Sequence, residues 1–158
     1  MPHPEWLIPR TCGDCTACCS RLPIPAGIVG PVAKPAGTPC PHLCSGGCAI
    51  YALRPQICAD FRCAWLQNDT WPADWRPDIS GMLCLREALA EDMPAALVYE
   101  LREGALAEPA AATVLAELVE SNALVVVVDA QEHRHVMPGN ALPETSTSHE
   151  PVAIHHAT

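Results

Sequence analysis

Hydrophobic and polar positions alternate regularly only in the second half of the chain. Residues 82–89 and 96–102 each predict a β-strand, and residues 91–94 form a short acidic turn between them. Residues 124–128 are a short continuous apolar run that predicts a third strand, with residues 133–137 as its hairpin partner. This half therefore predicts a small antiparallel sheet.

One helix is predicted between the second and third of these strands. It begins near Pro109, a residue that suits the first helical position, and it ends around residues 121–122. Its apolar residues recur at helical spacing and are Val114, Leu115, Leu118 and Val119. A single helix packed on a small antiparallel sheet is an α+β arrangement.

Residues 1–66 show no comparable period. They contain ten prolines, and their apolar residues are too sparse for a conventional core. The only helix of ordinary length predicted here runs from Gly47 through Leu53 and stops before Pro55, and a second helical turn begins at Pro55 and carries Cys58. Sulfur–metal bonds are the available means of holding such a segment together.

The expected organisation has four parts. Residues 1–66 form an irregular, cysteine-rich, metal-stapled unit, and residues 67–81 form a connector whose two tryptophans, Trp71 and Trp75, are expected to pack. Residues 82–138 form the small α+β layer. Residues 139–158 are polar, and they are expected to be a disordered tail.

Charge is spread unevenly over a chain whose formal net charge is -9. Residues 67–158 hold four basic and fifteen acidic residues, so the acidic second half is a candidate docking face for a protein partner. Residues 1–66 hold three acids and five basic residues, which are Arg10, Arg21, Lys34, Arg54 and Arg62. Cations near the cysteines would stabilise thiolates and lower their pKa.

The same composition excludes two classes of partner and indicates a compartment. An acidic chain lacks the clustered lysine and arginine needed to bind nucleic acid. The N-terminus has no secretory signal pattern, and the most apolar later run, residues 123–128, is far too short to cross a bilayer. We therefore expect a cytoplasmic protein that does not enter membranes, in which thiols stay reduced.

Nine of the ten cysteines fall between Cys12 and Cys63, which indicates either a metal site or a disulfide framework. Two residues separate Cys12 from Cys15 and Cys15 from Cys18, a spacing that lets neighbouring thiolates face one ion. Reducing surroundings favour the metal. A bacterial ferredoxin run is excluded because Cys19 follows Cys18 directly.

The adjacent pair Cys18 and Cys19 leaves two arrangements open. Neighbouring side chains diverge, so both rarely bind one mononuclear tetrahedral ion. Either two metals share this loop, or one of the two thiols is reactive or bridging.

The ordered motif over residues 12–66 resembles the bacterial CxxCxxCC family of zinc- or iron-chelating proteins, the YkgJ-like group. The resemblance implies a chelating set of Cys12, Cys15, Cys18, Cys19, Cys40, Cys48, Cys58 and Cys63. It also implies a structural signature of Ile50, Tyr51, Arg54 and Pro55. Cys44 and Cys84 have no counterpart in the motif, so we expect them to be spare buried thiols.

Three functions remain open at this stage. The leading prediction is a metal-binding protein that holds zinc or an iron–sulfur centre, since cysteine ligation suits both. The alternatives are a thiol-redox enzyme that uses Cys18 and Cys19 or a Cys-x2-Cys pair, and a metal-dependent protein-interaction module. Whether the protein is an enzyme stays undecided. His42 is a further candidate ligand, and Asp60 is a candidate to orient one.

Overall fold

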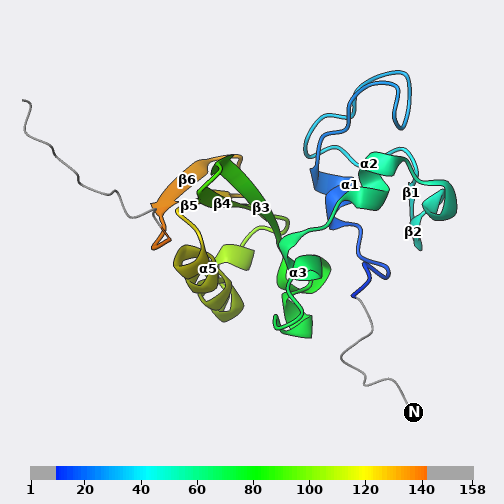
Figure 1. Ribbon diagram of the computed structural model, residues 1–158. Helices are drawn as coiled ribbons and strands as arrows, with labels where there is room; N and C mark the ends of the chain where they lie inside the picture. The colour runs from blue at the N-terminus through cyan, green and yellow to red at the C-terminus, as the bar shows by residue number, and fades with distance from the viewer. Residues whose placement is uncertain (1–9, 142–158) are drawn as a thin grey trace, which may run out of the picture.

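The computed structural model describes residues 10–141, and in Figure 1 these form two parts joined through a short helix. One part is a four-stranded sheet with a helix packed against it. The other part is the cysteine-rich unit, built from short helical turns and loops, and helix α3 (Ala64–Gln67) lies between the two. No helix among the described residues is long and apolar enough to cross a membrane.

The sheet has the strand order β3-β4-β5-β6. Its strands are β3 (Met82–Ala90), β4 (Met93–Glu100), β5 (Leu124–Val128) and β6 (Arg134–Pro138). The chain leaves β4 through the short helix η4 (Ala105–Ala107) and helix α5 (Pro109–Ser121) before it enters β5. The predicted α+β class, with a small sheet and one packed helix, is confirmed.

The direction of one strand differs from the prediction of an antiparallel sheet. The β3–β4 and β5–β6 pairs are antiparallel, but β4 and β5 run parallel, with Ala96 opposite Val125. The helical crossover between β4 and β5 is the cause, because it returns the chain to the end of the sheet at which β4 began.

Helix α5 forms where the apolar spacing predicts it. Pro109 is its first residue, and Ala111, Val114 and Leu118 are almost fully buried on one face. Spacings of three and four residues place these side chains in one stripe, which packs against Val125 and other core residues of the sheet.

The cysteine-rich unit has less helix than the sequence predicts. Its elements are α1 (Ala17–Arg21), β1 (Leu43–Cys44), β2 (Gly47–Cys48), η2 (Tyr51–Leu53) and α2 (Gln56–Asp60). The helix predicted from Gly47 is instead a strand followed by one tight turn, because Gly47 pairs with Cys44 in a two-stranded hairpin. The turn predicted at Pro55 is confirmed as α2, with Pro55 at its N-cap.

One hydrophobic core joins the two parts. It includes Ala17 and Trp65 from the cysteine-rich side together with Met82, Val98 and Leu118 from the sheet side. The connector contributes two further short helices, η3 (Ala73–Trp75) and α4 (Pro77–Ser80).

Both connector tryptophans pack, as predicted. Trp71 is 4% exposed, and its ring meets the edge of Trp75 with 5.2 Å between the ring centroids. Gly81, which ends α4, has a φ of +75° and leaves no room for a side chain, since a Cβ would lie 2.7 Å from Ala105 Cβ. The junction between the two parts is therefore tightly packed.

The first residues of the predicted tail form backbone hydrogen bonds with the rest of the fold. Backbone amides of Gly139 and Asn140 donate hydrogen bonds to the carbonyl oxygens of Ala123 and Val119, at 2.9 and 2.8 Å. These residues are thus held against the end of α5. The remainder of the predicted tail, like residues 1–9, lies outside the described residues.

Candidate metal centre

A cavity of about 440 Å³ opens within the cysteine-rich unit. The cysteines that line it are Cys12, Cys15, Cys18, Cys19, Cys40, Cys48 and Cys58. Apolar side chains that include Leu22, Ile24, Val29, Ile57 and Phe61 line the rest of its wall, and Arg10, Arg54 and Arg62 are the cations beside it. Seven of the eight residues in the predicted chelating set therefore face one space.

Short elements bring these cysteines together from distant parts of the sequence. The Cys15 amide donates to the Cys12 carbonyl oxygen at 3.0 Å, which closes a tight turn leading into α1. The Cys40 amide donates to the Cys19 carbonyl oxygen at 2.9 Å and so fixes the end of a long loop beside α1. The β1–β2 hairpin then presents Cys48, and α2 presents Cys58.

The remaining three cysteines do not line the cavity. Cys63 is 6% exposed and packs in the main core, near enough to Cys12 for the charges of the two thiolates to interact. Cys84 is buried in β3, and burial raises the pKa of its thiol to about 12. Cys44 is exposed, so the expectation of a buried thiol is wrong there. Cys44 occupies an open hairpin end, where its sulfur lies 3.3 Å from the Gly47 carbonyl oxygen.

The donor atoms in the cavity fit a thiophilic metal, since thiolates are the ligands that zinc and iron–sulfur clusters take. Within residues 10–141, however, no three His, Cys, Asp or Glu side chains are arranged as a group that could hold a metal ion. A cysteine sulfur moves by rotation about a single side-chain bond, χ1. Gathering these thiols around an ion therefore requires side-chain rearrangement.

Burial is the main cause that raises the pKa of the Cys15, Cys58 and Cys63 thiols. Neighbouring thiolates raise these pKa values further: Cys12 acts on Cys15 and Cys63. The pKa of Cys58 is raised by a different group of thiolates, those of Cys19, Cys40 and Cys48. A bound cation would remove this mutual repulsion.

The adjacent pair behaves differently from the other cysteines. A hydrogen bond between the two side chains lowers the pKa of Cys19 to about 6, and it raises the pKa of Cys18, which donates. Lys34, which is 5% exposed, further lowers the pKa of Cys19. Both interactions favour the thiolate form of Cys19.

Two residues near the thiols gave no individual signal in the sequence. Lys34 lies in an irregular loop, where its Nζ donates to the Leu22 carbonyl oxygen at 2.5 Å. Asp78, from α4, hydrogen-bonds Cys15 and forms an ion pair with Arg76. Neither position belongs to a periodic pattern, and Asp78 lies far along the chain from the cysteine it contacts.

Several other residues singled out in the sequence line the cavity, whereas Asp60 does not. His42 lines the cavity, and Tyr51 and Arg54 also line it, with the guanidinium carbon 3.9 Å from the ring centroid. Asp60 is exposed, and its carboxylate accepts a hydrogen bond from Gln56 at 2.6 Å. It makes no contact that would orient a cysteine.

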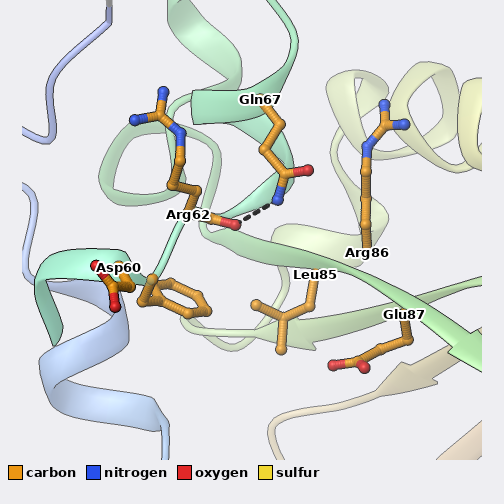
Figure 2. Close-up of a pocket in the computed structure, with 7 residues that line it drawn as sticks. Asp60, Arg62, Gln67, Leu85, Arg86 and Glu87 are labelled. Atoms are coloured by element: carbon orange, nitrogen blue, oxygen red, sulfur yellow. Dashed lines mark hydrogen bonds between the residues drawn. The ribbon is translucent and has the colours of Figure 1, made fainter. Parts of the chain in front are cut away.

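A second depression, of about 460 Å³, lies where the cysteine-rich unit meets β3. Figure 2 shows Gln67 reaching the Arg62 carbonyl oxygen, with the guanidinium group of Arg86 well apart from the Asp60 and Glu87 carboxylates. No cysteine lines this depression, and its charged groups do not converge. The cysteine-lined cavity is therefore the stronger candidate site.

Comparison of the chain with known protein families, with curated proteins and with solved structures finds no match. The resemblance to CxxCxxCC proteins therefore stays a prediction from the motif.

Proposed function

We propose that this protein binds a thiophilic metal, as zinc or as an iron–sulfur centre, in the cysteine-lined cavity. The observation that carries the proposal is the convergence of seven cysteines on one space of about 440 Å³. Elements separated by up to 46 positions in sequence supply these residues, from Cys12 to Cys58. A hydrophobic core alone gives no reason to collect that many thiols, whereas a metal does.

The surroundings of the cavity support the same function. Lys34 and three arginines place positive charge near thiolates, which offsets the negative charge of a cysteine-only site. Binding in the reducing cytoplasm would keep the thiols available for metal. Because the side chains are not arranged as a finished ligand set, metal uptake is expected to order the cysteine-rich unit.

Metal analysis of protein purified without oxygen tests this function. We expect at least one equivalent of zinc or iron per chain, and a visible spectrum together with acid-labile sulfide will distinguish the two metals. Removal by a chelator should lower the thermal stability of the protein. Folded, metal-free protein that takes up neither metal would contradict the proposal.

The β1–β2 hairpin offers a matched pair of variants for this experiment. Cys48→Ser removes a thiol that lines the cavity, whereas Cys44→Ser removes an exposed thiol that does not. The first variant should lose metal, and the second should keep it. Equal loss from both variants would show that the cavity is not the site.

The lowered pKa of Cys19 favours thiol-redox chemistry as a second candidate function. A Cys19 thiolate could attack a disulfide substrate, forming a mixed disulfide and releasing the other sulfur as a thiolate. Rapid alkylation of Cys19 in the metal-loaded protein would favour this alternative, because a metal-bound thiolate is protected from alkylation.

A further inference from the structure

The cavity cysteines pack in two places, and this division deepens the proposed metal-binding function. Cys12 and Cys15 contact the main core, in which Cys63 is buried. Cys19 and Cys58 contact a separate small core, formed by Ile24, Val29 and Cys40. The two groups of cysteines therefore pack against different hydrophobic clusters.

Charge interactions divide the thiols in the same way. Cys12 interacts with Cys15, Cys18 and Cys63. In the other group, Cys58 interacts with Cys19, Cys40 and Cys48. Cys18 of the first group also interacts with Cys19 of the second, its neighbour in sequence. These interactions name a set of four cysteines in each group.

Helix α1 explains why the boundary falls between Cys18 and Cys19. Consecutive residues of an α-helix project about 100° apart around the helix axis. Once the hydrogen bond between the Cys18 and Cys19 side chains is broken, one short helix can therefore direct Cys18 toward the turn that carries Cys12 and Cys15. On the same helix, Cys19 packs against the small core that contains Cys40, and its carbonyl oxygen accepts a hydrogen bond from the Cys40 amide.

Lys34 distinguishes the second set from the first. It is the only lysine of the chain, its side chain is buried, and its charge acts on Cys40, Cys19 and Cys18. Among the described residues no carboxylate forms a salt bridge with it. A buried cation needs a compensating anion, and two of the three thiols on which the Lys34 charge acts, Cys40 and Cys19, belong to the second set.

We propose that the cysteines form two separate four-thiolate metal centres, with Lys34 as the buried counter-charge of the second. The first centre comprises Cys12, Cys15, Cys18 and Cys63. The second centre comprises Cys19, Cys40, Cys48 and Cys58. This inference rests on the proposed metal binding, and it assigns each group of four cysteines its own ion or cluster.

Titration of the metal-free full-length chain with Co²⁺, a spectroscopic substitute for Zn²⁺, tests the division. Two equivalents should bind with the visible spectrum of tetrahedral thiolate coordination. Cys15→Ser and Cys58→Ser should each lose one equivalent and keep the other. Cys44→Ser should bind both. Failure of the wild-type chain to bind Co²⁺, Zn²⁺ or iron with sulfide would overturn metal binding itself and the two centres with it.

Other outcomes overturn the two centres while leaving metal binding intact. One is loss of the same single equivalent in Cys15→Ser and Cys58→Ser. A second test uses the wild-type protein and maps alkylated thiols by mass spectrometry as Co²⁺ is added. Two separate centres predict that the thiols become protected four at a time. Joint protection of Cys15 and Cys58 in singly loaded molecules would show a mixed ligand set. The wild-type measurement does not depend on any variant folding.

Removal of the Lys34 charge tests its assignment. Substitution of a residue that orients or neutralises metal ligands typically lowers metal affinity about 10- to 100-fold. Lys34→Met should therefore weaken Co²⁺ binding at the second centre by about that factor. Lys34→Arg should restore most of this affinity. Unchanged Co²⁺ affinity at the first centre shows that the Lys34→Met variant is folded. Arg86→Gln, which removes an exposed positive charge, is the control for a general effect of charge. Equal weakening of both sites would overturn the role of Lys34.

Discussion

Asp129 organises the turn between β5 and β6 through one carboxylate. Its Oδ1 accepts hydrogen bonds from the backbone amides of Gln131 and His133, each at 2.9 Å. Its Oδ2 lies 2.9 Å from Nε2 of His135. These interactions, chiefly the one with His135, hold the pKa of Asp129 at about 2, below its ordinary value of 3.8.

This lowered pKa predicts a specific loss of stability in acid. A carboxyl group whose pKa is lower in the folded state stabilises the fold above its ordinary pKa, and that contribution is lost as protonation proceeds. Asp129 should therefore contribute above pH 3.8 and lose its contribution as the pH falls toward about 2. Asp129→Asn should remove this part of the pH dependence.

Urea unfolding at several pH values across that interval measures the effect. The quantity of interest is the difference in unfolding free energy between Asp129→Asn and the wild-type protein. Asp74→Asn, which neutralises an exposed carboxylate elsewhere, serves as the control. A difference that stays constant over the interval would contradict the assignment.

At the scale of single elements, the β1–β2 hairpin depends on one backbone angle. Gly47 has a φ of +115°, a conformation that side chains rarely adopt, and it directly precedes Cys48. Gly46 precedes it in the same turn, has an ordinary φ, and has open space where a Cβ would lie. The two glycines thus differ in backbone angle, whereas both have open space at the Cβ position.

Gly47→Ala should destabilise the protein by about 1–3 kcal/mol and weaken metal binding, because it moves Cys48 out of place. Gly46→Ala should leave both properties near wild type. Chemical denaturation and metal titration of the two variants measure this contrast. Similar behaviour of the two alanine variants would show that the backbone angle does not position the thiol.

The elements that the sequence predicts best are those with a clear apolar pattern. Helix α5 matches its prediction because its apolar residues recur at helical spacing, and strand β5 matches because its residues form a continuous apolar run. The parallel pairing of β4 with β5 could also have been predicted from the sequence, because strands joined through a helix run parallel. The hairpin at Cys44 and Gly47 could not have been predicted from the sequence. Its strands have four residues in all, too few to show a strand period, and the residues from Gly47 onward also fit a helix.

The candidate site divides in a similar way. The resemblance of the ordered cysteine motif places Cys12 and Cys58 in one predicted chelating set, and both residues line the same cavity. Lys34 as a buried counter-charge could not be predicted. Its burial comes from the fold of a loop whose only regular pairing is an isolated bridge between Ile24 and Lys34.

At the scale of the whole molecule, the continuous core predicts that both parts unfold together. Leu118 in α5 is fully buried, and the same core contains Trp65 beside the cysteine-rich unit. Leu118→Ala should cost about 2–5 kcal/mol, the usual range for a buried leucine. Glu117→Ala, on the exposed face of α5, should have little effect.

Tryptophan fluorescence and far-ultraviolet circular dichroism follow different regions of the molecule during unfolding. The tryptophans of the described chain lie at the junction, whereas most of the regular structure lies in the sheet and α5. The two signals should shift together to lower urea in Leu118→Ala. Separate transitions would show that the two parts unfold independently.

Arg21 bears on whether this cysteine motif can be transplanted into other proteins. It ends α1, stacks its guanidinium carbon 4.5 Å from the centroid of the Tyr99 ring, and forms an ion pair with Glu132 at 2.8 Å. A fragment cut before the sheet would leave this cation without either partner, two positions from Cys19. Portable metal-binding cassettes made from this chain would therefore need to carry the sheet with them.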